Sequence, residues 1–200
     1  MSNFRIILAS ASPSRKRLLE SVGINPEIAV SGVDEENPDL LALSPREMVI
    51  ALAILKAHTV KESLNASDAL IIGCDSTFEF EGENLGKPLT RENAIARAKA
   101  MRGKSGYLHT GHCVIDTRGG YEVSDLSTSK VTFADMSDEE IENYVASGEP
   151  LNVAGGFTLD GLSAPFITHI DGDPSGIIGL SLPTLRKIVI NLGLKWSDLT

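Results

Sequence analysis

Residues 4–23 read FRIILASASPSRKRLLESVG, and this stretch decides the fold class. Its apolar beginning, FRIILAS, predicts a buried strand. Ser12 and Pro13 are typical of a helix N-cap and a first helical position, and Gly23 fits the C-terminal cap of that helix. A strand, a tight turn and a helix in succession favour an α/β protein.

A second unit of the same kind follows along the chain. Residues 26–31, PEIAVS, predict a strand, and residues 32–40, GVDEENPDL, predict a polar loop. Residues 44–47, SPRE, form a capping box with proline at the first helical position. A helix is therefore expected from there to about Glu62.

The later elements make the predicted sheet mixed. Residues 105–117 and 121–134 flank an RGG turn, which is the pattern of a long antiparallel hairpin. No repeat or linker divides the chain, so we expect one domain over residues 1–200, an α/β fold on a mixed, twisted sheet flanked by helices. The other expected elements are strands at 68–75, 77–82 and 166–170, a loop at 82–88, and helices at about 90–102, 137–148 and 183–193.

Composition places the chain among ordinary globular proteins. It has 200 residues, of which 42% are hydrophobic, and at this length folding buries roughly 70% of the surface of the unfolded chain. Cys74 and Cys113 lie in apolar stretches, which predicts two buried, reduced thiols. The N-terminal MSNFRIILAS lacks the pattern of a leader, and no run approaches a membrane span, so we expect a cytoplasmic protein without a membrane anchor.

The charge balance excludes some partners. The chain carries 18 Lys and Arg residues against 27 Asp and Glu residues, a net charge of −9. Without a basic block or stripe, polymeric DNA or RNA is not an expected partner. A small anion needs clustered cations, since one opposed charge pair at ~4 Å contributes about 4 kcal/mol at an effective dielectric constant near 20. A homodimer is expected from the frequency of that assembly alone.

Candidate phosphate ligands lie between the first strand and the first helix. Residues 8–17, LASASPSRKR, combine helix N-terminal N–H groups with serine hydroxyls and Arg15. The competing interpretation is an ordinary N-cap followed by solvated basic residues. Lys56 and Lys87 are further candidates, although either fits a plain surface lysine. Lys87 is favoured because Gly86 and Pro88 restrict its reach.

The candidate acids follow the apolar strands. Asp75 ends the strand LIIGCD, and in open α/β sheets ligands bind at the carboxyl ends of strands. A carboxylate there either binds Mg²⁺, takes a proton from an attacking water, or caps a turn. Asp34, Glu35 and Glu36 form an acidic loop that either completes a site for a hard cation or stays solvated. No CxxC, HExxH or GxSxG pattern indicates a zinc site or a serine hydrolase.

Several longer motifs, in order along nearly the whole chain, resemble the Maf family of nucleoside triphosphate pyrophosphatases. They are LASASPSRKRLLESVGI, VDEENP, ALAILKA, GCDSTFEFEGENLGKP, HTGHCVI, YVASGEPLNVAGGF and GDPSGIIGLSLPTL. The resemblance implies a fold similar to that of the inosine triphosphate pyrophosphatases, with an elongated mixed sheet and an active cleft between two lobes. It also implies metal-dependent hydrolysis of a nucleoside triphosphate to the monophosphate and pyrophosphate, a house-cleaning reaction linked to arrest of cell division.

The resemblance gives roles to single positions. Ser10 and Arg15 match the phosphate-contacting residues of the family, and Lys56 and Lys87 match its two lysines. Asp75 matches its proposed general base.

The implied cofactor is a divalent cation, Mg²⁺ or Mn²⁺. Asp34 and Glu35 match an acidic pair of the family, and with Asp75 they are the expected metal ligands. The alternative to an enzyme is a nucleotide-binding regulator of cell division without turnover.

The positions near the base depart from the family's pattern. Ser14 stands where the SPRR pattern has its first Arg and where the 7-methylguanine-type branch has Trp. The pyrimidine-type branch has Gln at the position of Asp160 and usually Lys at that of Val153. An ionised Asp160 accepts hydrogen bonds and donates none, so at that position it favours bases with donors, such as guanine or cytosine, unless it only caps its turn.

Overall fold

The computed structural model describes residues 4–200; residues 1–3, part of the stretch in which no leader is expected, lie outside it. The strands are β1 (Arg5–Leu8), β2 (Glu27–Ile28), β3 (Ala69–Phe80), β4 (Glu83–Leu85), β5 (Ser105–Asp116), β6 (Tyr121–Phe133) and β7 (Ile167–Asp171). The α-helices are α1 (Pro13–Ser21), α2 (Pro38–Leu41), α3 (Pro45–Leu64), α4 (Arg91–Met101), α5 (Asp138–Ala146), α6 (Pro174–Ile178) and α7 (Leu182–Asn191). Short 3-10 helices cover Glu149–Asn152, Ala154–Gly156, Ala164–Phe166 and Trp196–Asp198.

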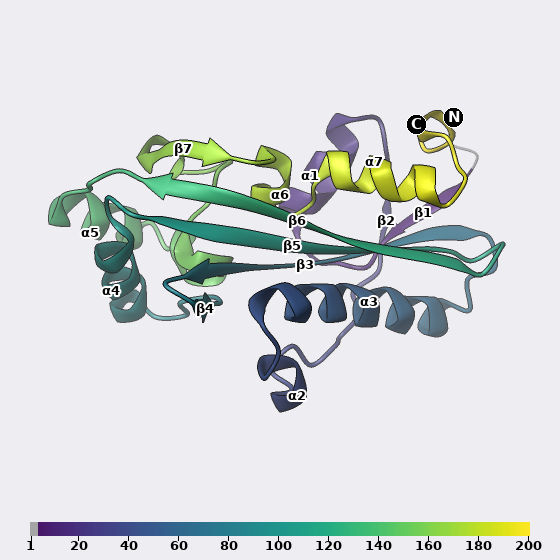
Figure 1. The fold of residues 1–200 in the computed structure, drawn as a ribbon, viewed down its shortest axis with the longest axis horizontal. Helices are drawn as coiled ribbons and strands as arrows, with labels where there is room; N and C mark the ends of the chain where they lie inside the picture. Colours follow the sequence, from purple (N-terminus) through teal and green to yellow (C-terminus); the bar gives the residue numbers. More distant parts are fainter. Residues whose placement is uncertain (1–3) are drawn as a thin grey trace. The chain divides into compact units, whose positions relative to one another are not determined.

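The strands form one mixed sheet. Their order is β2-β1-β3-β5-β6-β7, with β4 paired to β3. Strand β1 is parallel to β2 and β3, whereas β4 is antiparallel to β3 and β7 is antiparallel to β6. The predicted α/β class with a mixed sheet flanked by helices is therefore confirmed (Figure 1). Within residues 4–200, no helix is long and apolar enough to span a membrane.

The chain divides into two compact units. Unit 1 comprises residues 4–75, Thr110–Ser127 and Gly179–Thr200, and unit 2 comprises Ser76–His109 and Thr128–Ile178. The chain passes between the units within β3, β5 and β6, and again between α6 and α7. Neither unit is one continuous piece of sequence, which explains why no linker marks a boundary.

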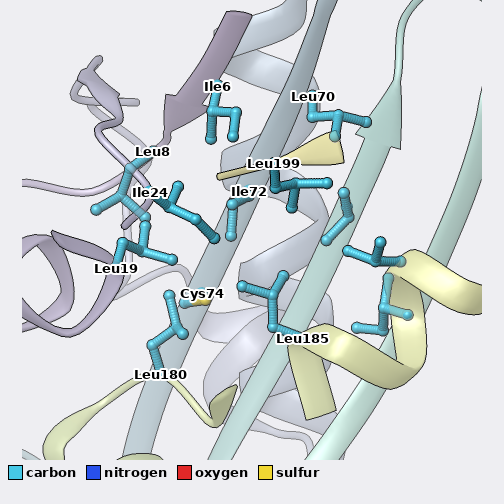
Figure 2. Close-up of a cluster of buried hydrophobic side chains, with 13 residues drawn as sticks. Ile6, Leu8, Leu19, Ile24, Leu70, Ile72, Cys74, Leu180, Leu185 and Leu199 are labelled. Carbon is cyan, nitrogen blue, oxygen red and sulfur yellow. The ribbon is translucent and has the colours of Figure 1, made fainter. Parts of the chain in front are cut away.

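Alternation along the strands builds two apolar faces in unit 1. Because neighbouring side chains of a strand point to opposite faces, Ile6 and Leu8 pack with residues of α1 and α7 (Figure 2), whereas Ile7 packs with residues of α3. Figure 1 shows α3 against one face of these strands and α7 against the other. Cys74 belongs to the α1 and α7 face and Cys113 to the α3 face; both are free and buried, as predicted.

Two glycines let α3 approach the sheet of unit 1 closely. A Cβ at Gly73 of β3 would lie 2.1 Å from the Ala53 carbonyl oxygen, and one at Gly111 of β5 would lie 2.2 Å from the Val49 carbonyl oxygen. Both distances are far below van der Waals contact, so any side chain would push the helix away. The close approach brings one helix face, and with it Lys56, onto the sheet.

Aromatic rings form the core of unit 2. Phe78 of β3, Phe133 of β6 and Phe157 pack edge to face, with ring centroids 5.0 to 5.8 Å apart. Edge-to-face packing is favourable because the positive edge of one ring meets the negative face of the other. A second apolar cluster, in which Ala98 meets Ile141, joins α4 to α5.

One predicted break and one predicted loop are wrong. Strand β3 is continuous, where the sequence predicts two strands separated near Ser76, because the polar side chains there find partners; the Thr77 hydroxyl, for example, donates to the Asn84 side chain. The expected loop at residues 82–88 contains β4, which pairs with β3 through a tight turn at Glu81 and Gly82. Both turn residues have positive φ, 53° and 87°, as hairpin turns of type I′ require.

Two short helices lie where the sequence predicts no helix. Helix α2 begins inside the acidic loop, where the Asn37 side chain accepts the N–H of Asp39 and Pro38 takes the first helical position. Helix α6 begins after Asp173, whose carboxylate accepts the N–H groups of the next turn. Both starts carry ordinary cap signals, but each helix is too short to show periodicity. Strand β2 of unit 1 covers only Glu27–Ile28 and is shorter than the strand predicted at residues 26–31.

Candidate active site

Asp75 is a buried carboxylate of unit 1. It lies on β3, on the face covered by α3, and is 8% exposed. Its Oδ1 accepts a hydrogen bond from Lys56 Nζ at 2.7 Å. Burial raises the pKa of Asp75 above the ordinary value of 3.8, although the positive charges of Lys56 and Arg15 oppose that shift. The carboxyl therefore holds a proton more tightly than a solvated aspartate does.

Lys56 bridges two carboxylates. The helix α3 places it on the buried face with Ala53 and Val60, and it is 6% exposed. Its ammonium lies 2.7 Å from Asp75 Oδ1 and 2.5 Å from Glu35 Oε1. The sequence alone leaves the direction of Lys56 open; the structure directs it to Asp75.

Arg15 is anchored at the start of α1. Ser12 caps the helix by accepting the Arg15 N–H. The Arg15 side chain is 9% exposed; its Nη1 donates to Ser10 Oγ at 2.9 Å and its Nε donates to the Gly179 carbonyl at 2.7 Å. Ser14, the residue before Arg15, is half-buried, and its hydroxyl oxygen accepts a hydrogen bond from Arg17 Nη2. Ser10 and Arg15 are therefore held together, beside the charge of Asp75.

The acidic loop supplies one carboxylate to this group. Glu35 reaches Lys56, and its side chain is 46% exposed. Asp34, also exposed, accepts the N–H of Glu36 at 3.0 Å and so closes a turn of its own. Among residues 4–200, no three His, Cys, Asp or Glu side chains lie close enough to hold a metal ion by themselves.

Lys87 and Asp160 belong to unit 2. Lys87 is exposed in the loop between β4 and α4, and Asp160 is exposed in the turn after Phe157. The structure thus gathers Ser10, Arg15, Lys56, Asp75 and Glu35 in one unit and places Lys87 and Asp160 in the other.

Glu149 organises the turn that carries Asp160. Its Oε1 accepts hydrogen bonds from the Thr158 hydroxyl at 2.6 Å and the Tyr144 hydroxyl at 3.1 Å, and the N–H of Leu162 lies 3.0 Å from both carboxylate oxygens. Burial works to raise the pKa of Glu149, but these hydrogen bonds together lower it. The residue that follows Asp160 must be small, since a Cβ at Gly161 would lie 2.5 Å from Glu149 Oε2.

His112 binds the backbone of residues 179–181, which Arg15 also contacts. Its Nε2 accepts the N–H of Ser181 at 2.8 Å, two residues after the Gly179 carbonyl that Arg15 binds. Nδ1 is the buried side-chain nitrogen without a hydrogen-bond partner among residues 4–200. Burial lowers the pKa of His112 to about 4. The neutral imidazole is thus part of the structure around Arg15.

Sequence patterns give little warning of these supporting residues. Glu149 stands in a motif quoted above, but nothing in its spacing shows that the donors of Tyr144, Thr158 and Leu162 converge on it. The acceptor on Gly179 is a backbone carbonyl, which no side-chain pattern reports. His112, on a predicted strand three residues from His109, has the wrong spacing for a shared ligand.

Known proteins match this chain over nearly its whole length. The family model of Maf-like proteins matches residues 5–192. A protein of Streptomyces coelicolor named nucleoside triphosphate pyrophosphatase is 52% identical over 195 residues, 98% of this chain and 94% of that protein. One of the same name from Thermosynechococcus vestitus is 48% identical over 192 residues, 96% of each.

Among solved structures, a nucleoside-triphosphatase, described as a dITP/XTP pyrophosphatase, from Mycobacterium abscessus also matches. It is 17% identical with a TM-score of 0.38, over 66% of this chain and 73% of that one.

Proposed function

This chain belongs to the Maf-like protein family, and on that premise we propose that it hydrolyses a nucleoside triphosphate to the monophosphate and pyrophosphate. The observation that carries the proposal is the buried Lys56 ammonium between Asp75 and Glu35, with Arg15 held beside them. A protein with a net charge of −9 has here two buried cations, which suit an anionic substrate, and a buried carboxylate, which suits proton transfer.

The proposed roles follow from the contacts. Arg15 and Lys56 neutralise negative charge of the triphosphate, which carries about four such charges. Lys87 is the further cation that we propose for a phosphate oxygen. Ser10, whose oxygen already accepts from Arg15, donates its hydroxyl hydrogen to a phosphate oxygen. Asp75 takes a proton from the water that attacks the α-phosphorus, and its raised pKa makes the carboxylate a stronger base than a solvated one.

The carboxylate pair also suits a divalent cation. Mg²⁺ is usually bound through one or two carboxylates plus substrate phosphates, and Asp75 and Glu35 converge on one point. We propose that these two, with Asp34 in the same loop, hold Mg²⁺ or Mn²⁺. The metal supplies charge neutralisation and polarisation of the phosphate oxygens.

Release of pyrophosphate tests the proposal. Purified protein with Mg²⁺ is incubated with GTP, 7-methyl-GTP, CTP, UTP and dTTP, and pyrophosphate and monophosphate are quantified. We expect both products in equal amounts from at least one nucleotide, and loss of turnover on addition of EDTA that excess Mg²⁺ or Mn²⁺ restores. Tight nucleotide binding without turnover would instead support a nucleotide-binding regulator.

A further inference from the structure

Arg97 of α4 holds the backbone next to Lys87. Its Nη1 donates to the Gly86 carbonyl at 2.6 Å, and the same carbonyl accepts the N–H of Gly155 at 3.3 Å. Gly86 is therefore fixed from two sides, by a side chain and by the backbone. Lys87 is the next residue along the chain.

The other side of Lys87 is fixed as well. The Pro88 carbonyl accepts from Asn93 Nδ2 at 3.2 Å, and the Leu89 N–H donates to the Leu151 carbonyl at 3.0 Å. Leu89 has φ of 65°, a left-handed conformation that is unfavourable for a residue other than glycine. A strained backbone held by surrounding contacts is typical of loops that must present one side chain in a defined place.

The charge of Arg97 is not needed for a simple loop contact. Burial lowers the pKa of Arg97, and among residues 4–200 its one polar partner is the neutral Gly86 carbonyl, with no carboxylate within ion-pair distance. Partial burial of a guanidinium without a counter-charge costs free energy. The contact with the Gly86 carbonyl is therefore the interaction that accounts for the place of the Arg97 side chain.

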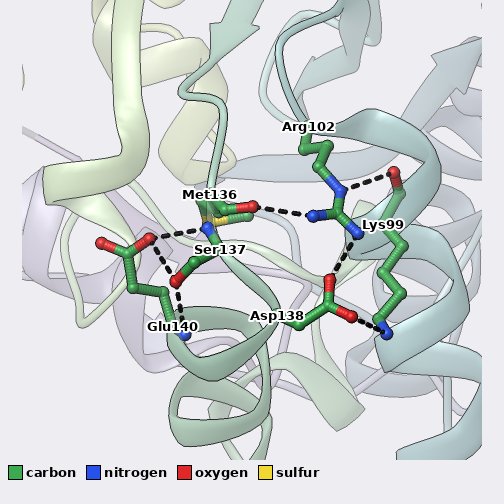
Figure 3. A network of polar contacts seen from close by, with 6 residues as sticks. All are labelled: Lys99, Arg102, Met136, Ser137, Asp138 and Glu140. Carbon is green, nitrogen blue, oxygen red and sulfur yellow. Dashed lines mark hydrogen bonds and ion pairs between the residues drawn. The ribbon is translucent and has the colours of Figure 1, made fainter.

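The helix that carries Arg97 is itself firmly placed. Figure 3 shows Asp138 of α5 between Lys99 of α4 and Arg102, the residue that follows α4. The Asp138 carboxylate lies 2.7 Å from Lys99 Nζ and 2.6 Å from Arg102 Nη2. Arg102 also donates to the Met136 carbonyl at 3.0 Å. The contacts of Lys99 and Arg102 thus fix the C-terminal end of α4 against α5, and they fix the helix that carries Arg97.

We propose that Arg97 is a positioning residue for triphosphate binding: through Gly86 it holds Lys87 in the place where Lys87 meets the β or γ phosphate. This inference rests on the proposed function only for the identity of the ligand. Because Arg97 acts through Lys87, its effect on affinity should vanish when Lys87 is absent.

A double-mutant cycle tests this dependence. Arg97→Gln, Lys87→Ala and the double variant are titrated calorimetrically with inorganic tripolyphosphate, which has no base, and with GMP, which lacks the β and γ phosphates. We expect each single variant to weaken tripolyphosphate binding about ten-fold and GMP binding much less. The double variant should bind tripolyphosphate no more weakly than Lys87→Ala. Arg91→Gln, which removes an exposed cation from the same helix, is the control for net charge and should change neither affinity more than about two-fold.

Three outcomes would overturn the inference. They are unchanged affinity in Arg97→Gln, unchanged affinity in Lys87→Ala, and a double variant whose loss is the product of the two single losses. Arg97→Lys keeps the charge but shortens the arm that reaches Gly86, and it should show the same non-additivity if Arg97→Gln does not fold. Absence of pyrophosphate release from every nucleotide would refute the proposed hydrolysis but leave the tripolyphosphate cycle interpretable.

Discussion

At the scale of single residues, two opposing effects set the proton affinity of Asp75. It is buried, which favours its neutral form, and it accepts a hydrogen bond from a buried ammonium, which favours its charged form. The balance keeps its pKa above that of an ordinary aspartate while Lys56 holds the carboxylate in one orientation. A general base needs both a fixed position and affinity for the proton.

Asp75→Asn should abolish hydrolysis but leave nucleotide binding in place. The amide keeps the shape but cannot take a proton, so kcat is expected to fall at least about 100-fold. Calorimetric titration with a non-hydrolysable triphosphate should give a Kd within a few-fold of the original, because Arg15 and Lys56 remain. In the unmodified protein, kcat/KM should fall as the pH is lowered through the raised pKa of Asp75, since the protonated form is inactive. Near-normal turnover in Asp75→Asn would refute the role.

His112 makes the folding stability depend on pH. Its pKa is about 4 in the folded protein against 6.5 in the unfolded chain, so the folded state keeps the imidazole neutral where the unfolded state protonates it. The contribution is present in full above pH 6.5 and is lost as the pH falls towards 4. We expect the loss of this contribution to lower the free energy of unfolding by about 3 kcal/mol between pH 6.5 and pH 4.

Urea unfolding at several pH values measures the contribution of His112. His112→Gln should lose less stability between pH 6.5 and 4 than the unmodified protein does. His169→Gln, which replaces an exposed histidine of β7, is the control and should retain the full loss. Equal losses in all three proteins would remove His112 as the cause.

The sequence predicts several of these residues but not how they meet. Arg15 follows an N-cap signal, and Asp75 ends an apolar run, so both could be placed near ligand-binding positions. Whether Lys56 faces the sheet or the solvent depends on how α3 rotates, and that is set by tertiary contacts with two glycines rather than by its own periodicity. The supporting carbonyl of Gly179 comes from another part of the chain, 164 residues from Arg15.

At the scale of secondary-structure elements, the distance between α3 and β3 decides whether Lys56 reaches Asp75. Gly73→Ala would place a Cβ against the Ala53 carbonyl, and the helix must shift. We expect a loss of about 3 kcal/mol in the free energy of unfolding, and a larger fall in kcat than in triphosphate affinity. Denaturant unfolding and steady-state kinetics measure the two effects. Gly86→Ala, where a Cβ meets nothing within 4 Å, should not lower stability; a similar loss in both variants would contradict the steric explanation.

The turn at residues 158–162 is the element proposed to select the base. Glu149 holds it rigid, so Asp160 is presented as a fixed acceptor. We expect GTP or CTP to have a higher kcat/KM than UTP and dTTP, because the dicarbonyl bases meet the carboxylate with repulsion. Asp160→Gln should shift the preference towards UTP and dTTP by roughly ten- to a hundred-fold. A clear preference of the unmodified protein for UTP or dTTP would exclude this role.

At the scale of the whole molecule, the fold class could be predicted and the division into units could not. Residues 4–23 place a strand and a helix where the structure has β1 and α1, and the RGG turn separates β5 from β6. The boundary between the units falls at Asp75 and Ser76, inside a continuous strand. The sequence predicts a break between two strands near this point, but residues 75–77 lie inside one continuous strand that serves both cores, so no linker marks the crossing.

The opposite placement of Cys74 and Cys113 gives each face of the unit 1 sheet its own chemical reporter. Burial raises the pKa of Cys74 to about 11 and raises that of Cys113 as well, so a maleimide finds almost no thiolate until the covering helix moves away. Labelling followed by peptide mass spectrometry therefore times the opening of each face separately. We expect Cys74 to react first, because α7 has 10 residues whereas α3 has 20, in close contact with the sheet. Equal rates would mean that both faces open in one cooperative event.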